Sequence, residues 1–130
     1  EKLELVKEYK RKIEQELEGI CTGIVTIINE KLLPGSQSSE SKVFYHKMEG
    51  DYHRYLAEFQ HGDEVTQSKD KALQAYQCAT TCSMEDMPPT HPIRLGLALN
   101  FSVFYFEILN SPERACSLAK QVRLQPRLLV

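Results

Sequence analysis

The chain has 130 residues, of which 42% are hydrophobic and 26% charged, a composition that suits one globular domain and excludes a disordered tail. A formal net charge of −2 gives no general basic field for nucleic acid, and no apolar run approaches the ~20 residues that span a bilayer. The four cysteines are too sparse for a secreted disulfide scaffold and the first residues lack a signal-peptide pattern, so we expect a cytoplasmic setting.

The first half of the chain predicts two amphipathic helices. One is expected over residues 1–31, because apolar residues recur there at steps of three and four. They are Val6, Tyr9, Ile13, Leu17, Ile20, Ile24 and Ile27. The sequence Leu33-Pro34-Gly35-Ser36 should end this helix. A serine among residues 38–41 can cap the second helix, which is expected over residues 42–60.

Three more helices are expected in the second half. Gly62 suits the end of the second helix and Asp63 the cap of the third, over residues 64–84. The inward residues of the third helix should be Val65, Ala72, Leu73, Tyr76 and Ala79. The fourth helix, over residues 92–109, is apolar on nearly every side and should be central. Ser111 should cap the fifth, over residues 112–124. With no strand pattern present, the sequence predicts an all-α antiparallel helical bundle or array.

Evidence for catalysis is slight. Cys78 and Cys82 lie four residues apart on one helix face, a spacing that a zinc ion could use, but no second ligand pair accompanies them. Buried cysteines explain the pair equally well. No phosphate-binding glycine loop, carboxylate pair or nucleophile elbow is present. We therefore expect no enzyme, no cofactor and no metal.

The second helix carries a polar stripe beside its aromatic residues. Lys47, Asp51, Arg54 and Glu58 follow one another at steps of four, three and four. An exposed ladder of ion pairs is one interpretation. An anion site is the other, in which the two acids hold the Arg54 guanidinium while it binds a phosphate and Tyr55 adds a hydroxyl.

The fourth helix carries an asparagine within an apolar run. Asn100 is either a polar link in the core or a group directed into a groove. Asn100 and Val103 share a face, with Leu99 at its edge. An amide and two aliphatic side chains suit a bound peptide.

Two long stretches resemble the signatures of the 14-3-3 family. They are residues 50–59 (GDYHRYLAEF) and 89–103 (PTHPIRLGLALNFSV). Shorter matches occur at residues 40–45, 109–112 and 115–120. The similarity extends from about residue 3 to residue 120, so residues 1–120 are expected to form a central part of the 14-3-3 fold and residues 121–130 a divergent tail.

The resemblance implies a regulatory adaptor that binds phosphoserine or phosphothreonine peptides of client proteins. By position, the phosphopeptide-binding residues would be Lys47, Arg54, Tyr55, Leu99, Asn100 and Val103. Dimer contacts, with like or related subunits, would come from Tyr9, Lys12 and Glu16. The alternative is a helical interaction scaffold that has lost phosphate selectivity.

The resemblance also leaves parts of the family pattern unmatched. The chain begins near the fourth helix of the family, without the third helix, which carries the other basic residues of the phosphate pocket, and Pro126 disfavours continuation of the eighth. Each missing charge-assisted bond costs about 1.5–3 kcal/mol, so we expect weaker binding than in an intact protein.

Overall fold

The computed structural model describes residues 1–124, with side chains as far as Gln121, and all regular structure in this range is helical. The elements are α1 (Lys2–Ile27), the π-helical turn η1 (Ile28–Leu32), α2 (Leu33–Gly35), α3 (Ser39–Phe59), α4 (Gly62–Asp86), α5 (Pro92–Glu107) and α6 (Pro112–Leu124). The prediction of an all-α fold is confirmed. Pro126 and the rest of the expected tail beyond residue 124 lie outside the described residues.

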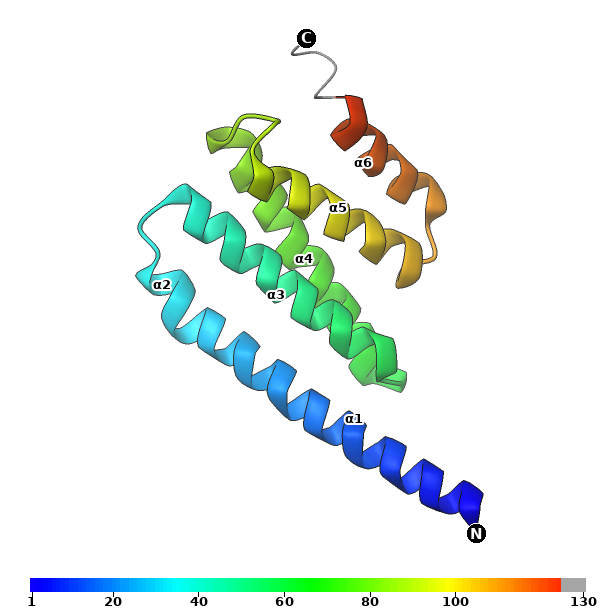
Figure 1. The fold of residues 1–130 in the computed structure, drawn as a ribbon. Helices are drawn as coiled ribbons and strands as arrows, with labels where there is room; N and C mark the ends of the chain where they lie inside the picture. Colours follow the sequence, from blue (N-terminus) through cyan, green and yellow to red (C-terminus); the bar gives the residue numbers. More distant parts are fainter. Residues whose placement is uncertain (125–130) are drawn as a thin grey trace.

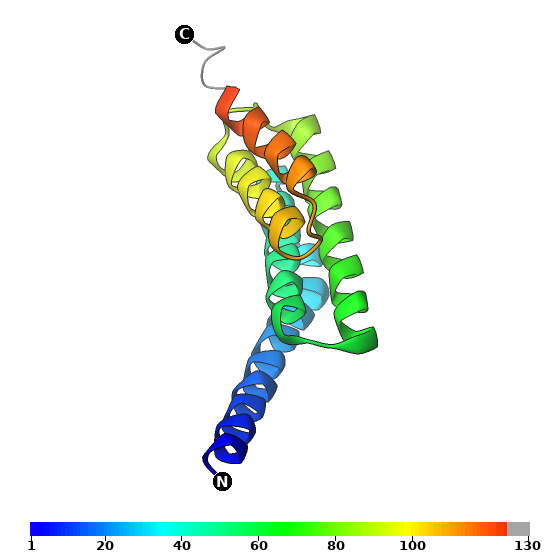
Figure 2. The same cartoon turned by 90° about the vertical axis from the view of Figure 1, so that its right-hand side faces the viewer.

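The long helices run antiparallel to their neighbours in sequence (Figure 1). α3 and α4 share the most extensive contact, α5 packs on both, and α6 packs on α5. α4 lies to one side of α3, and the N-terminal half of α1 projects beyond the other helices (Figure 2). The array therefore has a compact part, α3 to α6, and an extended arm.

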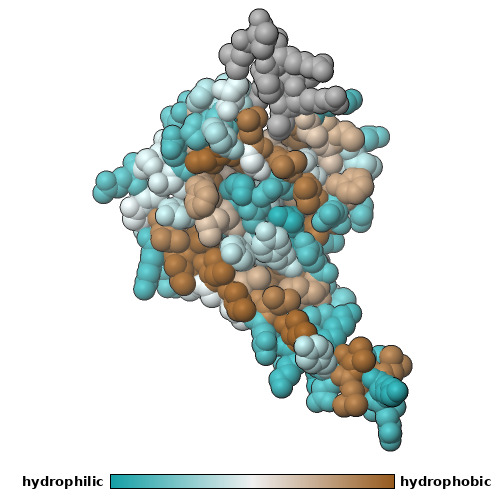
Figure 3. Space-filling model, viewed as in Figure 1, coloured by the Kyte–Doolittle hydropathy of each residue, from teal (hydrophilic) through white to brown (hydrophobic). Residues whose placement is uncertain are grey.

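The apolar row of α1 does not lie in the core. Val6 is 63% exposed, Tyr9 66% and Leu17 43%, whereas Cys21 and Ile28 are buried. Hydrophobic side chains consequently run along the projecting helix in the space-filling view (Figure 3). The periodicity predicts the helix, but it does not identify what covers its apolar face.

The helix ends follow local chemistry. Ser38 caps α3 by accepting a hydrogen bond from the Ser41 amide, as expected. The predicted cap at Asp63 is wrong, because His61 holds the N-cap position and Asp63 lies in the first turn of α4. Gly62 is not the end of α3 either, since Gln60 is the C-cap; the glycine takes a positive φ of 66° where the chain turns into α4. Likewise, the helical path after residue 31 continues through η1 to Gly35, because Pro34 lies in a first helical turn, where no amide donor is needed.

An aromatic cluster forms the core between α4 and α5. Tyr76 and Phe104 are fully buried, and the ring of Tyr76 stacks on Phe101 with centroids 5.1 Å apart. Of the five residues predicted to face inward on α4, Ala72, Tyr76 and Ala79 are fully buried, while Val65 and Leu73 pack half-buried against the core. This core fixes the relative positions of α3, α4 and α5, and those three helices carry the site described next.

Candidate functional site

The polar stripe of α3 lies largely inside the molecule. Asp51 is only 6% exposed and Arg54 8%, whereas Glu58 is exposed. An exposed ladder of ion pairs therefore does not describe Arg54. Removing a guanidinium and a carboxylate from water is costly unless each finds hydrogen-bonding partners. The local structure supplies those partners from three helices.

Asp51 is the acceptor at the centre of this cluster. The Lys47 ammonium lies 2.9 Å from its Oδ2, and the Asn100 amide donates to Oδ1 and Oδ2 at 3.1 and 3.2 Å. The Tyr76 hydroxyl donates to Oδ1 at 2.5 Å. One carboxylate thus joins α3 to α4 and α5. We call Lys47, Asp51, Arg54, Tyr76 and Asn100 the Asp51 cluster.

Each nitrogen of the Arg54 guanidinium has a polar neighbour. Its Nε donates to the Tyr76 hydroxyl at 3.2 Å, Nη2 lies 3.5 Å from Asp51 and Nη1 lies 3.7 Å from Glu58. The guanidinium carbon also lies 4.8 Å from the ring centre of Tyr55. Burial by itself would lower the pKa of Arg54, but the Tyr76 hydrogen bond and the Asp51 charge outweigh it, so the pKa is raised. The arginine therefore stays charged.

Apolar and aromatic side chains border the cluster. Tyr55 is 39% exposed and Leu99 is 56% exposed, while Val103 is half-buried one helical turn beyond Asn100. The same face of the molecule has a hydrophilic centre with hydrophobic side chains around it (Figure 3). A surface of this kind offers hydrogen-bond donors in the middle and apolar contact at the edge.

Tyr76 is the residue of this cluster that the sequence interpretation missed. It was predicted as an inward-facing core residue, and its ring is one, but its hydroxyl bonds to both Asp51 and Arg54. A buried tyrosine hydroxyl normally has a partner, so tyrosine in place of phenylalanine was the available signal. The partner could not be read from the sequence, because 25 residues separate Tyr76 from Asp51.

The residues predicted for dimer contacts lie elsewhere. Tyr9, Lys12 and Glu16 lie on α1 and are exposed. They contribute nothing to the Asp51 cluster. The structure therefore separates the two groups of predicted site residues into one surface on α3 and α5 and another on α1.

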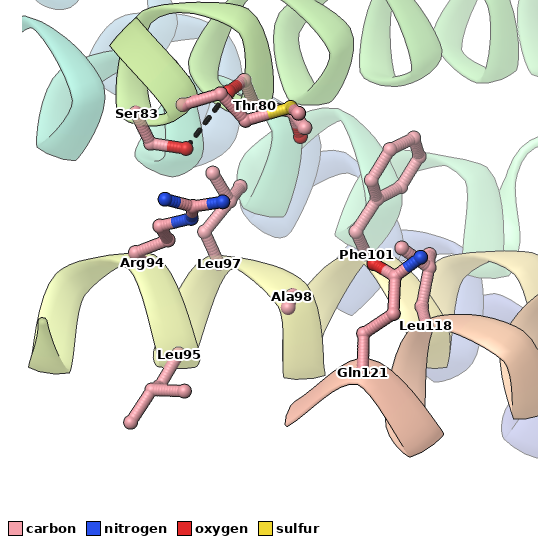
Figure 4. Close-up of a pocket in the computed structure, with 10 residues that line it drawn as sticks. Thr80, Ser83, Arg94, Leu95, Leu97, Ala98, Phe101, Leu118 and Gln121 are labelled. Carbon is pink, nitrogen blue, oxygen red and sulfur yellow. Dashed lines mark hydrogen bonds between the residues drawn. The ribbon is translucent and has the colours of Figure 1, made fainter. Parts of the chain in front are cut away.

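The other candidate sites are a small cavity, a cysteine pair without further ligands, and larger hollows of about 310–380 Å³ that are open to solvent. A cavity of about 70 Å³ lies between α4, α5 and α6, with Thr80, Arg94 and Leu118 among the residues that line it (Figure 4). It is far smaller than the ~300 Å³ or more of a ligand pocket. Cys78 is exposed and Cys82 half-buried, so burial does not explain the pair. Among the described residues no group of three or more potential ligands could hold a metal. None of the described helices contains an apolar stretch that would span a bilayer.

The fold and the Asp51 cluster define a class of protein, an all-α helical array that holds cationic and amide donors on one surface. A sequence model of the family described as 14-3-3 protein matches residues 1–125. The chain therefore belongs to the 14-3-3 family, which confirms the resemblance found in the sequence.

Individual relatives agree with this assignment. The chain is 62% identical over 117 residues to a 14-3-3 protein homolog of Trichoderma harzianum, covering 90% of this chain and 45% of that protein. It is 63% identical over 120 residues to a 14-3-3-like protein of Fucus vesiculosus, covering 92% and 48%. It is 60% identical over 119 residues to the checkpoint signal transducer rad24 of Schizosaccharomyces pombe, covering 92% and 44%. The chain thus spans about half the length of these relatives.

Proposed function

We propose that the protein binds phosphoserine or phosphothreonine peptides as a regulatory adaptor and has no enzymatic activity. The observation that carries the proposal is the convergence of Lys47, Arg54 and Asn100 on one buried carboxylate. These three polar side chains are thereby held together before any ligand arrives, which lowers the entropic cost of binding. The name of one relative, a checkpoint signal transducer, is consistent with a signalling role.

The Arg54 guanidinium retains capacity for a ligand. Its terminal nitrogens lie 3.5 Å from Asp51 and 3.7 Å from Glu58, whereas strong charge-assisted bonds are about 2.7–2.9 Å long. The acids therefore orient the guanidinium without saturating it. A phosphate oxygen at normal hydrogen-bond distance would form a better bond than either carboxylate does.

Charge balance limits the strength of this interaction. Lys47 and Arg54 are opposed by Asp51 and Glu58, so these four side chains carry no net charge. A doubly charged phosphate would meet donors but little net positive field. We therefore expect modest affinity for residues 1–130 alone, decreasing further as salt screens the exposed part of the site.

Asn100 and its neighbours suit the peptide on either side of the phosphate. The Asn100 side chain is half-buried and spends its amide protons on Asp51, which leaves its oxygen available as an acceptor for a peptide N–H. Leu99 and Val103 provide apolar contact beside it. In this proposal the phosphate binds near Arg54 and Tyr55, and the peptide backbone passes Asn100.

Fluorescence anisotropy with one peptide in phosphorylated and unphosphorylated forms tests the proposal. Arg54→Lys keeps the charge but removes the planar fork, so we expect phosphopeptide affinity to fall about tenfold, equivalent to about 1.4 kcal/mol. Arg114→Lys is the matched control, since Arg114 is exposed and also lies over a tyrosine ring, 5.8 Å from the centre of Tyr105. It should bind like the unaltered protein. Equal affinity of the unaltered protein for both peptides would contradict phosphate recognition.

That contrary outcome would favour the second candidate, a helical scaffold without phosphate selectivity. The observation behind it is the exposed apolar surface, including Leu17 on α1 and Phe106 on α5, which are 43% and 60% exposed. In such a scaffold peptides bind through apolar contact alone. Arg54→Lys would then leave both peptide affinities unchanged.

The remaining expectations belong to the same proposal. We expect cytoplasmic phosphorylated client proteins as partners, neither nucleic acid nor membrane among them, and association between subunits through Tyr9, Lys12 and Glu16. The exposure of those three side chains on the projecting helix supports the last point. Leu17→Glu, a change on the same helix, tests this association.

A further inference from the structure

We propose that Tyr76 is a positioning residue for phosphate recognition, because its hydroxyl occupies the Nε edge of Arg54 and leaves only the two terminal nitrogens for a ligand. A guanidinium can meet an oxyanion side-on, through Nε and one terminal nitrogen, or end-on, through both terminal nitrogens. The Tyr76 hydroxyl blocks the side-on geometry because it already binds Nε. The identity of the ligand rests on the proposed function, whereas the effect of Tyr76 on Arg54 does not.

The hydrogen bonds through Tyr76 can run in only one direction. Arg54 Nε has a proton and no lone pair to offer, so it donates to the tyrosine oxygen at 3.2 Å. The Asp51 carboxylate can only accept, so the tyrosine proton points to its Oδ1 at 2.5 Å. The only proton of the hydroxyl is thus used by Asp51, and one of its lone pairs by Arg54. Arg54 and Asp51 are linked through it in addition to their direct contact at 3.5 Å.

The Tyr76 ring has little freedom to move. It is fully buried and stacks on Phe101 at 5.1 Å, with Phe104 at 5.5 Å. On the α3 side it lies directly against Gly50, where a Cβ atom would come within 2.8 Å of the ring. Burial and the neighbouring Asp51 charge raise the pKa of the phenol, so it remains a donor. The position of the hydroxyl is therefore fixed by the packing of the ring, and its hydrogen bond to Nε orients the guanidinium.

Removing only the hydroxyl tests this inference directly. In Tyr76→Phe the ring packing stays, but Arg54 Nε–H loses its acceptor. Arginine Nε–H signals followed by NMR in the free protein should show exchange with water at least tenfold faster at Arg54. Tyr105→Phe is the matched control, because Tyr105 stacks on the same Phe101 ring at 4.7 Å and is half-buried. It should leave the Arg54 signal unchanged. An unchanged Arg54 signal in Tyr76→Phe would overturn the inference, whatever the protein binds.

Peptide titration separates this inference from the proposed function. We expect Tyr76→Phe to weaken phosphopeptide binding about tenfold and to leave the unphosphorylated peptide unaffected. In an Arg54→Lys background, Tyr76→Phe should change phosphopeptide affinity less than twofold, because the effects of two substitutions are not additive when one residue acts through the other. A changed Arg54 signal without any loss of phosphopeptide affinity would refute a positioning role in binding. If the unaltered protein does not prefer the phosphopeptide, the proposed function fails, while the effect of Tyr76 on Arg54 is still decided by NMR.

A measurement on the unaltered protein keeps the inference testable if Tyr76→Phe does not fold. A hydroxyl proton that is hydrogen-bonded to a buried carboxylate, as that of Tyr76 is to Asp51, should exchange slowly enough to be observed. We expect a Tyr76 hydroxyl resonance with a nuclear Overhauser contact to Arg54 Nε–H. Absence of a nuclear Overhauser contact between the Tyr76 hydroxyl and Arg54 Nε–H would contradict the proposed hydrogen bond between them.

Discussion

Gly50 controls how closely α3 approaches α4. Its missing side chain leaves room for the ring of Tyr76, which would lie 2.8 Å from a Cβ atom at this position. Because Tyr76 is fully buried, its ring cannot swing into solvent to make space. The glycine that begins the first signature stretch is thus explained by packing, in addition to any role of its neighbours in binding.

We predict that Gly50→Ala destabilises the protein. Overpacking a well-filled core costs about 1–3 kcal/mol, which exceeds the gain of about 0.5–1 kcal/mol from replacing glycine inside a helix. Gly19→Ala is the control, since Gly19 is also helical but nothing lies within 4 Å of its Cβ position. Urea unfolding should show lower stability for Gly50→Ala and unchanged or higher stability for Gly19→Ala. Equal shifts in the two variants would show that Gly50 has no special packing role.

Among the contacts between elements, a half-buried carboxylate joins η1 to α3. Glu49 on α3 accepts a hydrogen bond from Asn29 in η1 at 3.0 Å, and His46 Nδ1 lies 3.7 Å from its other oxygen. His46 and Asn29 outweigh burial and lower the pKa of Glu49. His53 lies nearby and is 6% exposed, and within the described part of the chain its buried Nδ1 has no hydrogen-bond partner. Burial lowers the pKa of His53 and exposed Lys71 on α4 lowers it further, although Glu49 acts in the opposite direction.

We predict that acid weakens the fold through His53. The pKa of His53 in the folded protein lies below the usual 6.5. As the pH falls, the unfolded chain therefore binds a proton at His53 more readily than the folded protein does, and the free energy of unfolding decreases. The melting temperature should decrease from about pH 8 to about pH 5, a range that excludes most of the Glu49 titration below 4.5. His53→Phe should flatten this decrease, whereas the same change at exposed His61 should not. Parallel melting curves for His53→Phe and the unaltered protein would refute the role of His53.

Helices were predictable from sequence where the signal was local. Spacing of apolar residues and turn residues indicated every long helix, and the cap at Ser38 was correct. The cap at His61 was not predictable in this way, because its side chain makes no capping bond and the turn alone places it. The polar stripe of α3 was visible, but burial of Arg54 and the Tyr76 link depend on the packing of α4, which spacing within α3 does not contain.

Across the described part of the molecule, α1 carries a long row of exposed apolar side chains. Val6, Tyr9, Leu17 and Ile20 are between 43% and 66% exposed along one helix, and Ile13 is 38% exposed between them. Contiguous apolar surface of this kind usually marks a contact with another protein. Its position away from the Asp51 cluster leaves both surfaces free to act together (Figures 1 and 3).

We predict that this row mediates association between copies of the chain. Leu17→Glu places a charge in the row, and losing one buried leucine contact of about 1.5–3 kcal/mol should raise the dissociation constant at least tenfold. Sedimentation velocity over a concentration series measures the effect. Phe106→Glu makes a comparable change on α5, at a side chain 60% exposed, and should leave association intact. Weaker association in Phe106→Glu but not in Leu17→Glu would place the contact elsewhere.

The proposed function requires that the Asp51 cluster bind the phosphate of a peptide. NMR shift mapping with matched phosphorylated and unphosphorylated peptides tests it most directly, because it reports where the phosphate acts. We predict that phosphorylation adds shift changes at Lys47, Arg54, Tyr55 and Asn100, with the largest at the Arg54 side chain. Changes confined to α1 residues such as Tyr9 and Leu17, or identical for the two peptides, would contradict the claim.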